Sequence, residues 1–365
     1  MPARTPRPPP APPAVARQAG LVHVSDRGPG IRRRRAGSGF AYVDADGRPL
    51  RDPETLQRIR ALAIPPAYTD VWICPLPHGH LQATGRDARR RKQYRYHPDW
   101  AQVRGDGKFD RLVAFGKALP RLRRRLRTDL ARSGFPREKV LAIVVAVMAD
   151  TLERIGNVEY ARSNRSYGLT TLRNRHAEFL RGGRARLRFR GKSGLEHDVV
   201  IDDRRLAGLM RACRQLPGQA LFQYRDDDDT LQPVGSGQVN DYLREAMGAE
   251  FTAKDFRTWG GTLAALQRLA RTPLPARPSE RALAQVHKDM LAEVATTLAN
   301  TPAVCRKAYV DPCVFAQWRE GALQVPDGVR GPRQWEHFAL RFLARAHRGN
   351  AARGRPAGVS RNRSR

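Results

Sequence analysis

The spacing of apolar residues divides the chain into two regions of different character. Between residues 36 and 106, the stretch GFAYVDADGRPL alternates around a D-A-D-G turn, and YTDVWICPL and GHLQATG have the composition of further strands. These patterns are typical of β-hairpins. From about residue 108 the apolar positions follow helical spacing, as in FDRLVAFGKALPRLRRRLRTDLA. The chain is therefore predicted to be α+β, with a small β-rich N-terminal domain and a mainly α-helical larger domain.

The larger domain, predicted over residues 107–347, contains one buried helix and one small β-hairpin sheet. The segment KVLAIVVAVMADTLERIG (139–156) has ten uninterrupted apolar positions, about half of what a membrane span needs, so a buried helix is expected. In RARLRFRGKSGLEHDVVI (184–201), Leu187 and Phe189 alternate with arginines before a GKSG turn and a return strand. This second pattern predicts a hairpin with Lys192 at its tip.

Both ends of the chain have a composition that is typical of disorder. Residues 1–35 are rich in Pro, Gly, Ala and Arg and end in IRRRR, and residues 348–365 are similarly basic and polar. Such segments bury too little apolar surface to order themselves. They are predicted to be flexible basic arms, and the N-terminal one has no apolar stretch of the kind found in secretion signals.

The charge of the chain indicates a polyanionic partner. Lys and Arg number 67 against 35 Asp and Glu, a formal net charge of +32. Nucleic acid is the expected partner, because neutralised phosphates release counterions, and a membrane surface is the weaker alternative. We expect the protein to remain in the cytoplasm. The four cysteines form no C-x-x-C pair and are predicted to be reduced and packed, without metal.

A basic and aromatic stretch, RDARRRKQYRYHPDW (86–100), is the predicted DNA-contacting surface of the N-terminal domain. Arginines and lysines alternate there with Tyr94, Tyr96 and Trp100. A solvated charged face is the simpler interpretation, but interleaved aromatics favour a surface that follows a phosphate backbone. The predicted contacts are Arg86, Arg89, Arg90, Arg91, Lys92, Tyr94 and Tyr96.

Several separated segments of the larger domain carry cations suited to a phosphate. Arg154 follows the buried helix, where it could also be a partner of the helix dipole. Lys192 lies at a hairpin tip, where a lysine is usually only solvated but can also deliver a proton. Lys254 and Arg257 are spaced i, i+3 and share a helix face.

The stretch LANTPAVCRKAYVDP (298–312) combines a tyrosine with two further cations, Arg306 and Lys307, and with Asn300. On one unbroken helix Asn300 and Tyr309 would lie on opposite faces. Thr301 is a good N-cap and Pro302 a good first helical residue, so one helix should end near Ala299 and another begin at Pro302. That break allows the phenol to approach Asn300.

These segments, in this order, resemble the type IB DNA topoisomerases, in the compact poxvirus-like form found in bacteria. The resemblance covers most of residues 36–345 and rests on the stretches GFAYVDADGRPL, IPPAYTDVWICP, GHLQATGRDARRRKQYRYHPDW, RIGNVEYARSNRSYGLTTLRNRH, FRGKSGLEHDV, KDFRTWGGT and NTPAVCRKAYVDP. It implies a tyrosine recombinase-like catalytic fold and a β-rich domain that helps to clamp duplex DNA.

The resemblance also implies a role for each candidate. Tyr309 would attack a phosphodiester and form a 3′-phosphotyrosyl link. Arg154 and Arg257 would hold the scissile phosphate, Lys192 would protonate the leaving 5′-oxygen, and Lys254 would serve the same proton path. Asn300 stands where many relatives have histidine; an amide can donate a hydrogen bond to a phosphate oxygen but does not titrate near neutrality. No metal, ATP or other cofactor is expected, and the enzyme is expected to be a monomer.

Two alternatives remain at this stage. A tyrosine site-specific recombinase shares the nucleophilic mechanism, but usually has His-x-x-Arg where this chain has Lys254-Asp-Phe-Arg257, and a helical N-terminal domain. A non-enzymatic basic DNA-binding protein would explain the charge but not the four phosphate-directed segments. The sequence contains no G-x-x-x-x-G-K-[ST] motif for ATP, and HGH (78–80), which resembles a metal motif, lacks a third histidine.

Overall fold

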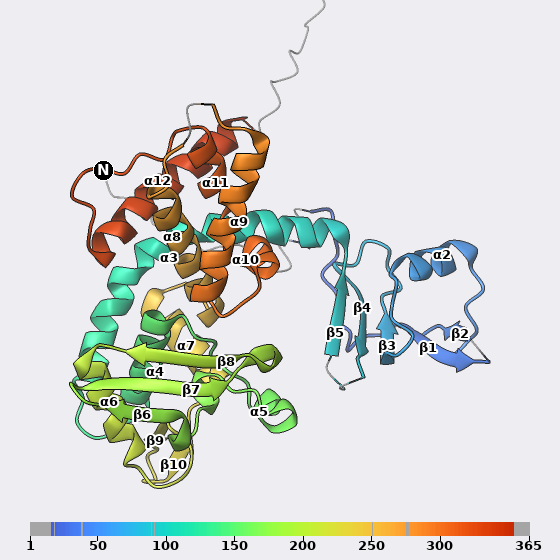
Figure 1. Cartoon of the computed structure of the whole chain (residues 1–365). Helices are drawn as coiled ribbons and strands as arrows, with labels where there is room; N and C mark the ends of the chain where they lie inside the picture. Colours follow the sequence, from blue (N-terminus) through green and yellow to red (C-terminus); the bar gives the residue numbers. More distant parts are fainter. Residues whose placement is uncertain are drawn as a thin grey trace, which may run out of the picture. The chain divides into compact units, whose positions relative to one another are not determined.

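A computed structural model describes residues 16–17, 19–37, 39–88, 90, 92–249, 251–274 and 277–353. The chain separates into two compact units, residues 1–109 and 110–365 (Figure 1). The predicted α+β class is confirmed: the first unit is built on a β-sheet and the second is mainly helical. The division lies close to the predicted boundary, but it falls inside a long helix, α3 (Pro98–Leu130), which begins earlier than the helical pattern of the sequence indicated.

The first unit is a five-stranded antiparallel sheet with one helix packed on it. The strand order is β2-β1-β3-β4-β5, and helix α2 (Pro53–Ala61) contributes Ile59 to the core. Around Ile59 the core contains Ile31, Val71, Ile73 and Ala83. The strands are β1 (Ile31–Ala36), β2 (Gly39–Val43), β3 (Thr69–Ile73), β4 (Leu81–Arg86) and β5 (Lys92–Tyr96).

The predicted disorder of residues 1–35 is wrong for much of the described part. The IRRRR run forms β1, which pairs with both β2 and β3. Arg33 lies over the Phe40 ring and donates hydrogen bonds to the carbonyls of Pro65 and Tyr68. An arginine stem covers apolar surface while its guanidinium satisfies loop carbonyls, so an arginine run can form a strand. Residues 1–15 lie outside the described residues.

The second unit surrounds the buried helix α4 (Arg137–Thr151), whose residues from Val140 to Val145 are all buried. The predicted hairpin forms β7 (Arg184–Arg190) and β8 (Glu196–Ile201), joined by a single turn of 3-10 helix, η3 (Lys192–Gly194), and β6 (Ala177–Leu180) extends it to three strands. A second pair, β9 (Gln223–Arg225) and β10 (Leu231–Pro233), was not predicted, because three-residue strands are too short to show alternation.

Helices complete this unit. Two single turns of 3-10 helix, η1 (Leu169–Thr171) and η2 (Asn174–His176), precede the three-stranded sheet. The helices that follow α4 are α5 (Val158–Asn164), α6 (Arg204–Arg214), α7 (Ser236–Met247), α8 (Ala253–Ala270), α9 (Glu280–Thr297), α10 (Pro302–Ala308), α11 (Pro312–Arg319) and α12 (Pro332–Arg353). Helix α12 therefore extends past residue 348, where a disordered tail was predicted, and residues 354–365 lie outside the described residues.

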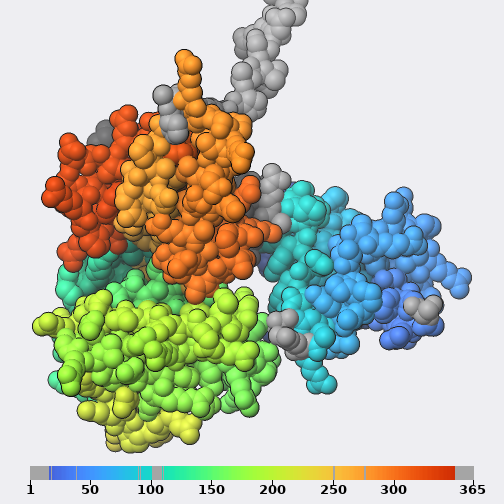
Figure 2. All heavy atoms as spheres, viewed as in Figure 1, coloured from blue at the N-terminus to red at the C-terminus, as the bar shows by residue number. Residues whose placement is uncertain are grey.

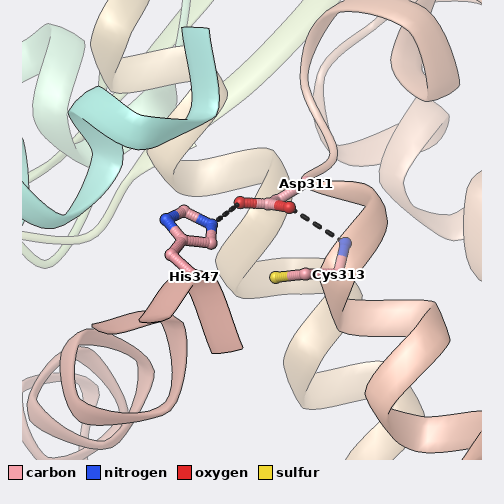
Figure 3. Close-up of side chains that lie close together, drawn as sticks. All are labelled: Asp311, Cys313 and His347. Carbon is pink, nitrogen blue, oxygen red and sulfur yellow. Dashed lines mark hydrogen bonds and ion pairs between the residues drawn. The ribbon is translucent and has the colours of Figure 1, made fainter. Parts of the chain in front are cut away.

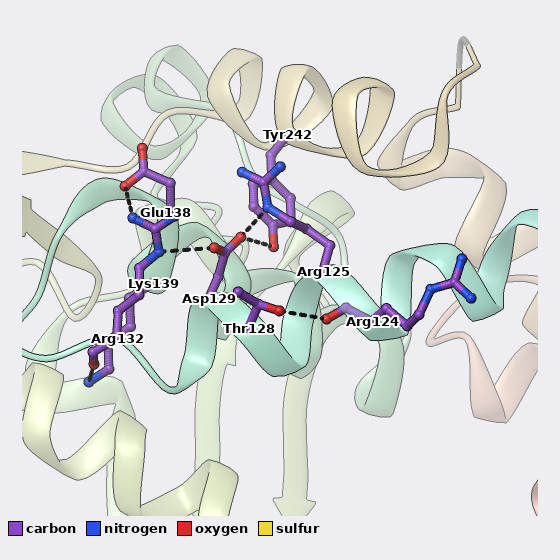
Figure 4. Close-up of polar contacts among 8 residues, drawn as sticks. All are labelled: Arg124, Arg125, Thr128, Asp129, Arg132, Glu138, Lys139 and Tyr242. Carbon is purple, nitrogen blue, oxygen red and sulfur yellow. Dashed lines mark hydrogen bonds and ion pairs between the residues drawn. The ribbon is translucent and has the colours of Figure 1, made fainter.

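A buried carboxylate fastens the end of α3 to its neighbours (Figure 4). The side chain of Asp129 is fully buried and accepts hydrogen bonds from Arg125 at 2.5 Å, Arg132 at 3.0 Å and the Tyr242 hydroxyl of α7 at 2.9 Å. A buried charge is tolerated only when it is paired and hydrogen-bonded in this way. Among the described residues, no helix is both long enough and apolar enough to cross a bilayer.

Candidate active site

A pocket of about 350 Å³ in the second unit brings five of the six predicted catalytic residues together. They come from four separate stretches of sequence, and they are Arg154, Lys192, Lys254, Arg257 and Tyr309. In the space-filling view the orange residues of α9 and α10 lie directly above the lime-green residues of the β6–β8 sheet (Figure 2). Four cations and one phenol therefore line the same pocket.

Arg154 lies in an irregular segment after α4 and not on the helix itself. Helix α4 ends at Thr151, and Leu152 takes a left-handed conformation with φ of 56°. Arg154 therefore lies three residues beyond the end of α4, and its guanidinium donates to the carbonyl of Ala299. Gly156, with φ of +97°, lets the segment approach Gly168 so closely that a Cβ on Gly168 would be 2.6 Å from the Arg154 carbonyl oxygen.

Arg257 is held rigidly on α8 against the ring of Tyr309. Only 4% of the residue is exposed, and its guanidinium donates to the carbonyl of Leu298 at 2.6 Å and to that of Leu152. Its guanidinium carbon lies 5.1 Å from the centre of the Tyr309 ring. The Arg154 guanidinium donates to the carbonyl of Ala299 at 3.4 Å, and burial, followed by the charge of Arg257, lowers the pKa of Arg154. Both arginines are thus preorganised before any phosphate binds.

The two lysines are exposed at the edge of the pocket. Lys192 lies at the tip between β7 and β8, where the next residue, Ser193, has a positive φ of 64°. Lys254 lies in the first turn of α8, which is closed by a hydrogen bond from the Thr252 amide to Asp255 at 2.8 Å. An ammonium group on a short turn can reach a bound strand and donate a proton.

The backbone of Tyr309 is fastened to α8 on both sides. Thr262 donates to the Tyr309 carbonyl at 3.2 Å and accepts from the Asp311 amide at 3.1 Å. The Thr-Pro break is confirmed: α9 ends at Thr297, α10 begins at Pro302, and Thr301 caps α10 by accepting from the Val304 amide. Tyr309 is the C-cap residue of α10.

Asn300 lies next to the pocket but is not one of its lining residues. Its side-chain oxygen accepts from the Thr301 amide at 3.3 Å, and its Nδ2 is buried without a hydrogen-bond partner among the described residues. The neighbouring Ala299 carbonyl accepts from Arg154. Asn300 thus directly follows two residues whose carbonyls accept from the arginines, Leu298 from Arg257 and Ala299 from Arg154. Arg306 and Lys307 lie on α10 and are both exposed.

A carboxylate two residues after Tyr309 connects this segment to the C-terminal helix (Figure 3). Asp311 accepts from the Cys313 amide at 2.9 Å and lies 2.7 Å from His347 Nε2 on α12. The ligand atoms of these three residues lie within 4.8 Å of one another. However, hydrogen bonds already occupy both carboxylate oxygens, and burial and then Asp311 raise the pKa of the Cys313 thiol, which opposes thiolate formation. The cluster is best explained as a structural anchor for Tyr309.

The predicted DNA-contacting stretch of the first unit forms β5 and its flanking turn. Tyr94 and Tyr96 are 48% and 41% exposed, and their rings are stacked with centres 6.0 Å apart. Lys92 forms an ion pair with Asp26, and Arg86 forms one with Asp70. Arg90 adopts a positive φ of 58° in the turn, whereas Arg89 and Arg91 lie outside the described residues.

Trp100 does not belong to this surface, contrary to the sequence interpretation. It is 3% exposed and packs with Ala16 and Leu21, two residues of the segment that was predicted to be disordered. In a similar way His80 of the HGH motif is buried, accepts from the Val24 amide at 3.1 Å and stacks on His23. Both are packing residues, and the four cysteines are likewise free and buried.

The sequence interpretation missed several residues of the pocket. Tyr160, Ser166 and Tyr167 line it, yet no composition or charge signal distinguished them from other residues of the same stretch. The pair of glycines in the WGGT motif was a usable signal: a Cβ on Gly261 would be 2.9 Å from the Tyr309 carbonyl oxygen, so the nucleophile could not pack there against a larger residue.

Comparisons with known proteins agree with this geometry. Residues 97–317 match the model for "Eukaryotic DNA topoisomerase I, catalytic core", and residues 39–87 match that for "Bacterial DNA topoisomerase IB, N-terminal domain". The chain is 34% identical over 290 residues to DNA topoisomerase 1B of Acanthamoeba polyphaga mimivirus, covering 77% of this chain and 85% of the relative. It is 24% identical over 272 residues to DNA topoisomerase 1B of Vaccinia virus (strain Copenhagen), covering 70% of this chain and 79% of the relative.

The fold and the site therefore define a DNA topoisomerase, an isomerase. The chain belongs to the type IB DNA topoisomerase family, and a tyrosine recombinase is not favoured.

Proposed function

We propose that this enzyme relaxes supercoiled duplex DNA by cutting one strand through Tyr309 and rejoining it. The phenol loses its proton to solvent and its oxygen bonds to phosphorus, while the bond from phosphorus to the 5′-oxygen breaks. Lys192, assisted by Lys254, gives a proton to that oxygen. The 3′ end stays on Tyr309 and the free 5′-hydroxyl strand turns before the steps reverse.

The arrangement of Arg257 carries this proposal. Its buried guanidinium is fixed by two backbone carbonyls and lies against the Tyr309 ring, so a phosphate at the phenol would meet a cation that needs no rearrangement. Arg154 and Asn300 would donate to the same phosphate. A phenol with an ordinary pKa near 10 is a weak nucleophile, and neighbouring cations stabilise its anion.

Three further properties are part of the proposal. The phosphotyrosyl link conserves the energy of the broken bond, so resealing needs no ATP. Cations do the work that a metal would otherwise do, so EDTA should not inhibit. The proposed nucleophile, both arginines and both lysines meet within one chain, so the proposed site needs no second copy, and we propose a monomer that acts on duplex DNA of the nucleoid in the cytoplasm.

Replacement of Tyr309 by phenylalanine tests the proposal. In EDTA and without ATP, the unaltered enzyme should relax plasmid and yield a covalent complex in SDS, with the DNA attached through its 3′ end. Tyr309→Phe should bind DNA but should neither relax plasmid nor form the covalent complex. Tyr224→Phe is the matched control, because that hydroxyl does not line the pocket and accepts a hydrogen bond from Gln238 at 3.0 Å. Relaxation by Tyr309→Phe would contradict the assignment of the nucleophile.

A further inference from the structure

A buried acid and a buried histidine lie directly behind the pocket and do not touch it. Glu153 Oε1 lies 2.7 Å from His197 Nδ1, and the two side chains are 6% and 1% exposed. A hydrogen bond therefore joins the two side chains directly. Glu153 immediately precedes Arg154 in the chain, and His197 lies on β8 of the hairpin that carries Lys192.

The imidazole of His197 packs against the backbone of the hairpin tip. Its ring stacks on Phe189 of β7, with centres 4.8 Å apart and 15° between the planes. The backbone of Gly191 passes so close that a Cβ there would be 2.4 Å from His197 Nε2. Gly191 has an ordinary φ of −95°, so glycine is needed here for space and not for backbone conformation. The position of the ring therefore sets the position of the residue before Lys192.

Stability alone does not account for this pair. Glu153 Oε2 and His197 Nε2 have no hydrogen-bond partner among the described residues, so the pair is incompletely satisfied. Apolar replacement of a buried ionic pair is often neutral or stabilising. What the pair does provide is one direct link between the segment of Arg154 and the hairpin of Lys192.

The two ends of this link are not held equally well. Arg154 is held independently, since its carbonyl accepts from the Leu169 amide at 2.9 Å and its guanidinium donates to Ala299. Among the described residues, the tip beyond Arg190 has only local backbone hydrogen bonds, from the Gly191 amide to Leu195 at 2.7 Å and from the Gly194 amide to Gly191 at 3.2 Å. We propose that Glu153 and His197 are positioning residues that hold the Lys192 turn in register with Arg154. This inference rests on the proposed roles of Lys192 and Arg154.

Loss of the link should therefore impair protonation of the leaving oxygen more than binding of the phosphate. The double variant Glu153→Leu/His197→Phe fills the same buried space with apolar side chains and should fold. Its single-turnover cleavage of ordinary duplex DNA should fall by up to about 10²-fold, the usual result of a small misplacement. With a bridging sulfur in place of the 5′-oxygen, a leaving group that needs no proton, its rate should return close to that of the unaltered enzyme.

Three other variants make the result decisive. Gly191→Ala pushes the tip off the His197 ring and should give the same sulfur rescue even if the double variant unfolds. Glu153→Gln keeps the accepting oxygen and should retain activity. Glu178→Leu, an exposed carboxylate on β6, is the matched control for loss of charge and should behave as unaltered.

The outcomes separate this inference from the proposed function. If Lys192→Ala is slow with both substrates, the proposed role of Lys192 is wrong. If sulfur rescues Lys192→Ala, the inference is overturned when the folded double variant or Gly191→Ala cleaves ordinary DNA at full rate. It is equally overturned when the cleavage rates of these variants fall by the same factor on ordinary DNA and on DNA with the bridging sulfur.

Discussion

Gly261 of α8 lies against the backbone of Tyr309, where a Cβ would be 2.9 Å from the Tyr309 carbonyl oxygen and 3.2 Å from its Cβ. The next residue, Thr262, hydrogen-bonds that same carbonyl. The helix that carries Arg257 thus also determines how closely the backbone of Tyr309 approaches it. Because the contact is with backbone, it cannot be relieved by rotation of a side chain.

Gly261→Ala should therefore lower the rate of DNA cleavage, although alanine favours helix by up to about 1 kcal/mol. A displacement of Tyr309 by roughly 1 Å should cost on the order of 10²-fold in single-turnover cleavage. Gly208→Ala on α6 is the control, because nothing lies within 4 Å of its Cβ position, and activity should be unchanged. Equal activity of the two variants would show that the close approach does not position the nucleophile.

Asn300→Ala should reduce cleavage without weakening DNA binding. Its buried Nδ2 is a donor suited to a phosphate oxygen, and loss of one such donor costs about 10²-fold or somewhat more. Asn300→His should retain activity and introduce a dependence on pH near 6.5, the ordinary pKa of imidazole. Gln285→Ala, an exposed amide on α9, is the control. A full rate for Asn300→Ala would exclude a role in the transition state.

Tyr94 and Tyr96 should contribute to DNA affinity without affecting its salt dependence. Affinity should fall about 10³- to 10⁵-fold between 50 and 200 mM salt if roughly 6 to 10 phosphates are neutralised. Tyr94→Ala/Tyr96→Ala should weaken binding at every salt concentration with the same slope, because no charge is removed. Arg306→Ala/Lys307→Ala should make the slope shallower. Fluorescence anisotropy with a short duplex measures both, and a flat salt response would contradict backbone binding.

His176 should make the folded state less stable in mild acid. Burial, with the charges of Arg175 and Arg173, lowers its pKa to about 4, and its Nδ1 accepts from the Arg173 amide at 3.0 Å. Between about pH 6.5 and 4 the unfolded chain binds a proton that the folded chain does not. As the pH is lowered through that window, the free energy of unfolding should therefore decrease, by at most about 3 kcal/mol.

His176→Asn is the variant that isolates this effect, because its side-chain oxygen can accept from the same amide and binds no proton. Urea denaturation at pH 7.5 and pH 5 should show a smaller loss of stability for the variant than for the unaltered chain. Parallel losses would mean that other groups cause the acid sensitivity.

The sequence by itself determined the fold class, the hairpin with Lys192 at its tip and the break at Thr301 and Pro302. These features depend on local rules: alternation of apolar residues, turn composition and helix capping, each of which operates within a few residues. The reactive cations and Tyr309 were also identified from the sequence, through a resemblance that spans separated motifs and through the chemistry of phosphate recognition.

Only the tertiary structure decided which surfaces those residues share. Four features join segments far apart in the chain: the burial of Trp100, the pairing of β1 with β3, the contact between Gly261 and Tyr309, and the link from Glu153 to His197. No periodicity encodes such contacts, because they depend on which faces pack together once the whole core has formed.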